Sequence, residues 1–419
     1  MSALFLLLLV VGLLILRQPL IIILIAAIAY VQMVWGAGEL VYIVEDMWVS
    51  LNKELILAVP LFLLCGGVMT KGSSARRLVR IVQSLTRQVR GGLGVATILS
   101  CGVFSAISGS SIVTMIAVGS VLYPAMTAAG YSKRYALGSV MAGGTLGIII
   151  PPSVPLILYG LVTETSIVAL FLAGILPGLL LMVILAIHAS LANRNVPAEP
   201  FDPAEFRAAL KGGIWAALFP VILLGGIYSG LYSPTESAAI ALAYALFIEF
   251  VIHRDMRLND YIEVASETAK LGGALFPLLA VALSLNLVLT ENHVPAQLVS
   301  LATDHIHSPL AFLLIANLLL LAVGCVMTTN EAILILAPLM LPMAEAYGFS
   351  PVHWGVIMIV NLEIGFLTPP VGLNLMVAMI TFREKFSLLV RAALPFIGLL
   401  LIGLFIIALV PWLSLAFVK

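Results

Sequence analysis

Two short polar stretches interrupt long apolar runs of this sequence, and their side chains are of a kind that binds hard cations. They read FSAISGSS (Phe104–Ser111) and GCVMTTN (Gly324–Asn330). Hydroxyl, amide and free carbonyl oxygens are the ligands that Ca²⁺ prefers and that Na⁺ takes in transporters. The candidate cation ligands are Ser105, Ser108, Gly109, Ser110 and Ser111 in the first stretch, and Met327, Thr328, Thr329 and Asn330 in the second. For any single Ser or Thr, a hydrogen bond between membrane helices is the alternative.

Two double prolines form the second recurring feature, in GIIIPPS (Gly147–Ser153) and GFLTPPV (Gly365–Val371). Proline removes a backbone donor and clashes with the preceding turn, so each pair predicts a broken helix. A break frees carbonyl groups for a cation and creates a helix N-terminus whose partial positive charge suits a carboxylate. The sequence therefore adds Thr145, Gly147, Pro151, Glu363, Gly365, Thr368 and Pro369 as cation-site candidates, and Ser153 and Asn374 as substrate contacts.

Composition shows what kind of protein must position these residues. The 419 residues are 62% hydrophobic and only 10% charged, and the mean hydropathy is +1.18, whereas a soluble domain has roughly 25% charged residues. Runs long enough to cross the bilayer recur along the chain. The fold class is therefore an all-α polytopic membrane protein, with apolar segments near 2–16, 18–35, 55–70, 91–127, 135–161, 166–192, 214–230, 236–252, 271–290, 308–343, 353–380 and 390–417.

Several other classes of function are disfavoured by the same sequence. The formal net charge is zero, which gives no reason to expect a nucleic-acid partner. The three cysteines lie in apolar segments without metal-ligand spacing and are expected to be buried thiols. Neither an HExxH motif nor a nucleophile turn stands in a membrane segment, so an enzyme is not expected. Residues 1–16 are predicted to be a spanning helix and not a signal peptide, because no basic region precedes them.

The runs 91–127 and 308–343 are each about twice the length of one hairpin leg, and the polar stretches interrupt them centrally. We therefore predict two re-entrant helical hairpins, with the polar stretches at their tips. Unpaired backbone groups at membrane depth are tolerated only where protein or a watery cavity satisfies them. A pair of ordinary spanning helices with polar kinks is the alternative.

The hairpins and breaks form an internal repeat. Pro369 lies 218 residues after Pro151, and the same offset pairs Pro124 with Pro342, Gly130–Ser132 with Gly348–Ser350, and Ser110–Ser111 with Thr328–Thr329. We assume that the basic segment 71–90 is cytoplasmic and that each hairpin enters and leaves the membrane on the same side. The successive membrane crossings then place all Lys and Arg except Lys53 and Lys419 on the cytoplasmic side. This topology places the N-terminus outside and inverts the two repeats, which is typical of a secondary transporter. Segment 71–90 itself is predicted to be either a solvated loop or an amphipathic helix on the membrane surface.

On these residues the chain resembles the large membrane subunit of the tripartite ATP-independent periplasmic (TRAP) transporters, the DctM-like family. The resemblance covers essentially the whole chain and is carried by FSAISGSS, GGTLGIIIPPS, SPTESAA, EAILILAPLMLP and NLEIGFLTPPVGLN in this order. It implies an inverted-repeat, elevator-type importer in the bacterial inner membrane, coupled to Na⁺, that carries organic anions such as dicarboxylates, sialic acid or sugar acids. It also implies two partners outside this chain, a periplasmic substrate-binding protein and a small four-helix DctQ-like membrane subunit, besides membrane lipid. No cofactor other than the coupling ion is implied.

The resemblance also divides the chain. Hairpin and broken helix form a transport half at 91–166 and again at 308–380, and residues 1–90, 167–307 and 381–419 form the scaffold. One departure concerns the second tip: the family is expected to carry an acidic residue after the methionine, but Thr328 follows Met327 here. This changes the expected charge of the second cation site, although coordination by carbonyl groups would survive it.

The remaining intramembrane acids and the competing functions complete the expectations. Glu236, three residues after Ser233, fits a capping box at a helix start, while Glu331 and Glu363 are functional candidates because they are acids at membrane depth. The alternatives are a self-sufficient Na⁺/carboxylate symporter that needs no binding protein, and a channel, which two inverted half-sites fit less well. The sequence specifies neither the carboxylate nor the number of Na⁺ ions.

Overall fold

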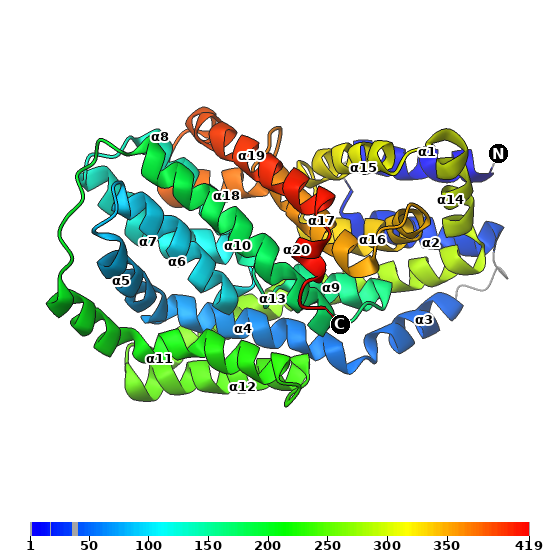
Figure 1. Ribbon diagram of the computed structural model, residues 1–419. Coiled ribbons are helices and arrows are strands. Elements are labelled where there is room, and N and C mark those ends of the chain that lie inside the picture. The colour runs from blue at the N-terminus through cyan, green and yellow to red at the C-terminus, as the bar shows by residue number, and fades with distance from the viewer. Residues whose placement is uncertain (1, 17, 36–40, 419) are drawn as a thin grey trace.

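The computed structural model describes residues 2–16, 18–35 and 41–418, and throughout these ranges the chain forms helices and connecting turns without a strand (Figure 1). Eight helical segments of this described part are long and apolar enough to cross a membrane. The sides of the membrane predicted for Arg17 and Lys419 concern residues outside the described ranges.

The N-terminal region ends in the basic segment whose structure the sequence left open. Its elements are α1 (Ser2–Ile15), α2 (Leu20–Val34), α3 (Val41–Leu51), the 3₁₀-helix η1 (Glu54–Leu57), α4 (Ala58–Lys71) and α5 (Ser74–Thr86). Helix α5 buries Leu78, Val79 and Val82 while Arg76 and Arg80 stay exposed. The predicted helix is therefore confirmed, and the loop alternative is wrong because the apolar residues recur at helical spacing. Its predicted position on the membrane surface stays a prediction.

The first polar stretch and the first double proline both end helices. Helix α6 (Gly92–Ser108) is followed by α7 (Ser111–Ala128), and α8 (Lys133–Ile149) is followed by α9 (Val154–Thr163). Gly109 makes the turn between α6 and α7 at φ = 58°, a left-handed conformation that glycine adopts without steric cost. The predicted hairpin and break are thus present as two pairs of separate helices, and how the hairpin enters the membrane stays a prediction.

Six elements lie between α9 and the second hairpin: α10 (Ile167–Ala192), α11 (Pro203–Tyr228), α12 (Pro234–Phe247), the π-helix η2 (Ile248–Ile252), α13 (Leu258–Glu291) and α14 (Val294–His305). Helix α12 begins with the predicted capping box, in which Ser233 accepts from the Glu236 N–H and the Glu236 carboxylate accepts from the Ser233 N–H. The connection 291–307 contains no Lys or Arg, and most of it is the helix α14.

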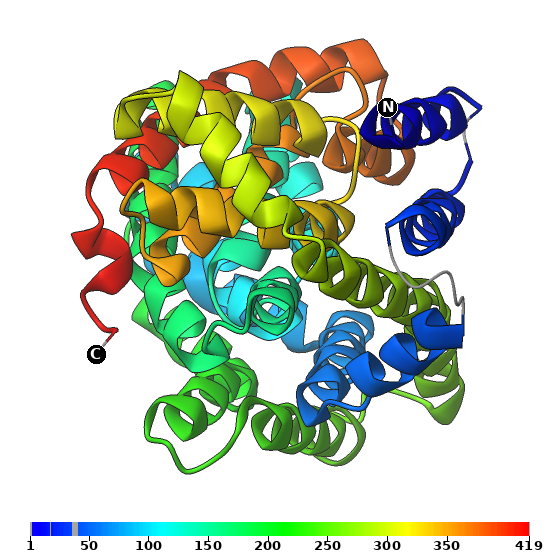
Figure 2. The ribbon, with the colours of Figure 1, turned by 90° about the vertical axis from the view of Figure 1, so that its right-hand side faces the viewer.

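The second repeat consists of α15 (Pro309–Gly324), α16 (Thr329–Ala346), α17 (Pro351–Gly365), α18 (Leu373–Phe382) and α19 (Phe386–Leu409), and α20 (Trp412–Leu415) follows. Shifting the bounds of α6 to α10 by 218 residues reproduces the bounds of α15 to α19 within two residues. The same shift pairs α5 with α14, and these two helices lie at opposite ends of the molecule (Figure 1); Figure 2 faces the end at which α14 lies. The two repeats therefore run in opposite directions through the fold.

Ion pairs connect the segments that the charge pattern assigned to the cytoplasmic side. Arg80 bonds Glu205 at 2.8 Å and Lys133 bonds Glu384 at 2.9 Å, and Arg87 pairs with Glu199. The first and third contacts join the segment 71–90 to residues 199–205, and the second joins the start of α8 to the connection between α18 and α19. The side of the membrane on which these segments lie stays a prediction.

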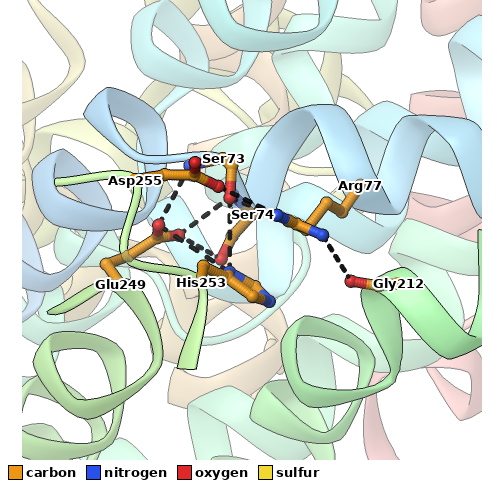
Figure 3. A network of polar contacts seen from close by, with 7 residues as sticks. All are labelled: Ser73, Ser74, Arg77, Gly212, Glu249, His253 and Asp255. Atoms are coloured by element: carbon orange, nitrogen blue, oxygen red, sulfur yellow. Dashed lines mark hydrogen bonds and ion pairs between the residues drawn. The ribbon is translucent and has the colours of Figure 1, made fainter. Parts of the chain in front are cut away.

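The N-terminus of α5 is held by a buried acid from η2 (Figure 3). Glu249 is fully buried and accepts hydrogen bonds at 3.0 Å from the backbone N–H groups of Ser73 and Ser74. Arg77 bonds Asp255 at 2.9 Å, and hydrogen bonds from Ser73 and Arg77 lower the pKa of Asp255. Burial, followed by the charge of Arg77, lowers the pKa of the neighbouring His253. A carboxylate at a helix N-terminus complements the helix dipole, so this contact fixes where α5 begins.

Candidate functional site

The first hairpin tip lies directly against the first helix break. A Cβ atom built on Gly147 would lie 2.5 Å from the Ser110 carbonyl oxygen and 2.7 Å from the Thr114 hydroxyl, and one on Gly109 would lie 3.0 Å from the Pro152 carbonyl oxygen. Such distances are shorter than van der Waals contact. The glycines therefore allow the backbone of the tip to touch the backbone on both sides of Pro151.

The second tip and the second break meet in the same way. A Cβ atom on Gly365 would lie 2.6 Å from the Gly324 Cα, and the Gly372 N–H donates a hydrogen bond of 3.1 Å to the Cys325 carbonyl. The residues between them, including Met327, Thr368 and Pro369, belong to the turns on either side of this contact. The offset of 218 residues therefore relates two close contacts as well as two sequence motifs.

Both tips line one cavity of about 370 Å³, which the helices α4 and α13 close on another side. Its wall includes the first residues of four helices, at Ser110–Val113 of α7, Val154–Pro155 of α9, Thr328–Glu331 of α16 and Leu373 of α18. Helices α4 and α13 contribute apolar side chains, namely Leu63, Leu271, Ala274, Leu275 and Leu278. None of the described residues in the wall is Lys, Arg or His. Helix N-termini are therefore the groups in the described wall that could attract an anion.

Some of the predicted hydroxyl ligands are already hydrogen-bonded within their own helices. Ser105 donates to the Cys101 carbonyl and Thr145 to the Ala142 carbonyl, each at 2.6 Å, and Thr368 donates to the Ile364 carbonyl at 2.8 Å. Ser108 bonds the Thr114 hydroxyl at 2.6 Å. A hydroxyl that donates its proton keeps its oxygen lone pairs as acceptors, so these contacts leave the predicted cation role open.

Three predicted site residues are N-caps. Ser110 accepts from the Val113 N–H, Ser153 from the Leu156 N–H and Thr328 from the Glu331 N–H. At the second tip Glu331 completes a capping box by accepting from the Thr328 N–H at 3.1 Å. Ser153 is fully buried, and its predicted substrate contact remains a prediction.

The acid in the second broken helix lies between the predicted site residues of that repeat. Glu363 receives a contact from the Thr329 hydroxyl at 3.4 Å and another from the Asn374 amide nitrogen at 3.3 Å. Ser111 of the first tip is a further polar neighbour of its carboxylate. The fold therefore brings residues of both tips and of the second break to one acid, although they are distant in the sequence.

Sequence reasoning missed two parts of this site. The apolar wall from α4 and α13 carries no motif that distinguishes it from other membrane-facing residues. The capping box at the second tip does have a sequence signal, the pattern Thr-x-x-Glu at Thr328–Glu331.

Comparisons with known proteins fit this arrangement. The family model of the tripartite ATP-independent periplasmic transporter, DctM component, matches residues 6–413. The chain is 43% identical to the C4-dicarboxylate TRAP transporter large permease protein DctM of Pseudomonas aeruginosa, over 86% of this chain and 85% of that one. It is 34% identical to the ectoine TRAP transporter large permease protein TeaC of Halomonas elongata, over 97% and 96% of the two chains.

A fused relative and a solved structure extend the comparison. The chain is 36% identical to the isethionate TRAP transporter permease protein DctMQ of Oleidesulfovibrio alaskensis, over 91% of this chain and 61% of that longer one. Among solved structures, the YdaH transporter of Alcanivorax borkumensis superposes with a TM-score of 0.68 at 17% identity, over 92% of this chain and 90% of that one. At this identity the superposition shows a shared fold.

Proposed function

We propose that this chain, which belongs to the DctM family of TRAP transporters and is a large permease subunit, couples Na⁺ entry to the import of an organic anion. The observation that carries the proposal is the convergence of four helix N-termini on one cavity without a basic side chain in its described wall. Each helix N-terminus carries about half an elementary positive charge. Four of them suit a carboxylate or sulfonate held at membrane depth.

The cation sites lie where each tip meets its break. The first uses the stretch Ser105–Ser111 with Thr145, Gly147 and Pro151, and the second uses Met327–Asn330 with Gly365, Thr368 and Pro369. Backbone carbonyl and hydroxyl oxygens are abundant at both contacts, and the glycines bring the two backbones close enough to share one ion. Bound Na⁺ would hold each tip against its break and so complete the wall of the anion cavity.

The transport cycle is of the elevator type in this proposal. The segments 91–166 and 308–380 move together as the transport domain, because α9 packs against α16 and α18 against α7 across the repeat boundary. The remaining helices form the scaffold, with α5 connecting α4 to the first hairpin. The protein lies in the bacterial inner membrane with its N-terminus in the periplasm, as the distribution of Lys and Arg favours.

Two partner proteins complete the transporter: a periplasmic substrate-binding protein that delivers the anion, and a small DctQ-like membrane subunit. The fused DctMQ relative supports the second partner, since the chain covers only 61% of its length. The names of the relatives supply the first substrates to test, which are C4-dicarboxylates, ectoine and isethionate.

Uptake into proteoliposomes tests the proposal. The chain is reconstituted with the binding protein and small subunit encoded beside it, and uptake of each candidate substrate is measured with an inward Na⁺ gradient and with choline in its place. We expect uptake of one anion that requires Na⁺ and both partners. Uptake by this chain without a binding protein would instead establish a self-sufficient symporter, and uptake that ignores the Na⁺ gradient would overturn the proposed coupling.

A further inference from the structure

Glu363 on α17 is a buried acid without a compensating charge. Its side chain is 0% exposed, and none of the ion pairs among the described residues includes it. A carboxylate in such a place is strongly unfavourable unless a cation or proton neutralises it. An intramembrane acid of this kind points to an occupant that the protein itself does not supply.

The polar atoms around Glu363 are spaced like the ligands of an ion. The Thr329 hydroxyl lies 3.4 Å from one carboxylate oxygen, and the Asn374 amide nitrogen lies 3.3 Å from the other. The Asn374 contact is longer than the 2.7–3.2 Å usual for N–H donors, and the Thr329 contact is longer than the 2.5–3.0 Å usual for O–H donors. Oxygen ligands lie about 2.4 Å from Ca²⁺, and the distance is close to this for the similarly sized Na⁺. In octahedral geometry, neighbouring ligands at this distance lie about 3.4 Å from each other.

Asn374 supplies a second, independent observation. The residue is 0% exposed, yet its amide oxygen has no hydrogen-bond partner among the residues that the structure describes. A buried amide oxygen left unpaired is unfavourable. Its oxygen and nitrogen are distinguished only by their surroundings, so a half-turn of the amide brings this oxygen to the position beside the Glu363 carboxylate.

The repeat shows that the fold does not require an acid at this position. The residue 218 positions before Glu363 is Thr145, whose hydroxyl donates to the Ala142 carbonyl within its own helix at 2.6 Å. Helices α8 and α17 form equally well around the two residues. The carboxylate is therefore an addition to the second repeat only.

We propose that Glu363, together with Asn374, Thr329 and Ser111, binds one Na⁺ ion of its own, separate from the two ions that the repeated contacts between tips and breaks would hold. The proposal rests on the Na⁺ coupling proposed above, and it makes Asn374 a cation ligand in place of a substrate contact. One carboxylate with neutral oxygens balances a single positive charge. Among the described residues no three acidic, His or Cys side chains gather as a multivalent metal would favour.

The location of this site has a consequence for the anion. Glu363 and Glu331 are the charged side chains in the described wall of the cavity, and Glu331 is engaged with the N-terminus of α16. An empty Glu363 site would repel a carboxylate in the cavity, whereas a Na⁺ ion there removes the repulsion. Na⁺ is therefore expected to bind before the anion.

Counting bound ions tests the proposal. Equilibrium binding of radioactive Na⁺ is measured on the full-length protein in lipid nanodiscs at neutral pH, with choline keeping the ionic strength constant. We expect Glu363→Gln to bind one Na⁺ ion fewer than the wild type. Glu345→Gln removes an exposed carboxylate from α16 and is expected to leave the count unchanged.

Each outcome decides between the two proposals. If Glu363→Gln binds as many ions as the wild type, as it would if the acid were permanently protonated, this site is refuted while the Na⁺ coupling stands. If the wild type binds no Na⁺, the proposed coupling fails as well. If Glu363→Gln is not monodisperse, the test uses Asn374→Ala, which keeps the carboxylate. In this variant the Na⁺ affinity of one class of binding sites should fall at least about tenfold. Unchanged Na⁺ affinities would overturn the proposal.

Discussion

Adding one methyl group at Gly147 should separate the first hairpin tip from its helix break. The new Cβ atom would lie 2.5 Å from the Ser110 carbonyl oxygen. To restore an ordinary contact of about 3.5 Å, the tip must move by about 1 Å. Metal sites require ligand distances to hold within about 0.2 Å. Gly147→Ala is therefore expected to disrupt the first cation site even though it leaves every predicted ligand side chain in place.

The expected magnitude follows from the same contact. Overpacking of this kind costs about 1–3 kcal/mol, and the strain is greatest when the tip is held against the break, as in the Na⁺-bound form. If the strain appears only in that form, Na⁺ affinity falls about 5- to 150-fold. Gly365→Ala should behave alike at the second site, because its Cβ would lie 2.6 Å from the Gly324 Cα.

A thermal-shift assay measures this effect without the partner proteins. The melting temperature of the purified full-length protein is recorded as NaCl replaces choline chloride, and the half-saturating Na⁺ concentration is compared between variants. Stabilisation by a ligand grows with its concentration relative to the dissociation constant, so the midpoint should shift to higher Na⁺ in Gly147→Ala.

A matched control separates this effect from the general consequences of replacing a glycine. Gly273 lies in the middle of α13, where an added Cβ would meet nothing within 4 Å. Gly273→Ala should be neutral or should stabilise the helix by about 0.5–1 kcal/mol, with an unchanged Na⁺ response. If Gly147→Ala is monodisperse and responds to Na⁺ as Gly273→Ala does, the contact between tip and break is not a cation site.

Three further predictions concern the scaffold. Glu249→Ala leaves two buried N–H groups at the start of α5 without an acceptor, which costs about 1–3 kcal/mol for each group. The melting temperature of this variant should therefore fall well below that of Glu345→Ala, a control at an exposed site. Equal melting temperatures would refute the anchoring role of Glu249. The folded protein lowers the pKa of His253 below 6.5, so the unfolded chain binds more protons near that pH. The free energy of unfolding should therefore decrease as the pH falls through 6.5. His253→Asn should weaken this pH dependence, and an unchanged pH profile would contradict the role of His253. Ser233→Ala removes the cap of α12 and should cost about 1 kcal/mol, seen as a lower melting temperature, whereas an unchanged value would show that the cap is redundant.

The sequence predicted the hairpins, the breaks and the capping box of α12 because each depends on local chemistry. Paired prolines end a helix whatever surrounds them, and Ser233 and Glu236 are close enough in the chain to cap without tertiary contacts. Helix α14 was not expected, because it lies between the apolar segments 271–290 and 308–343. The repeat contains the missing signal, since α14 is the counterpart of α5 at the 218-residue offset.

The partners of individual side chains were less predictable. The Thr145 hydroxyl turns to its own helix, while the Thr329 hydroxyl turns to Glu363, and sequence spacing does not distinguish these two rotamers. The Glu249 contact joins η2 to α5 across 175 residues. Such contacts depend on how distant helices pack, which hydrophobic periodicity alone does not specify.

In the proposed mechanism, helix N-termini of the hairpins and the breaks hold the anion without a basic residue in the described wall of the cavity. An arginine in the wall would attract the anion whether or not Na⁺ was present. Four helix N-termini supply the attraction of about two elementary charges, and Glu331 and Glu363 oppose it. The balance between these opposing charges is close, so one or two bound cations decide its sign. In the proposed mechanism the affinity for the anion therefore depends on Na⁺, which is the condition for using a Na⁺ gradient to drive import: a carrier that bound the anion equally well without Na⁺ would let it leak back.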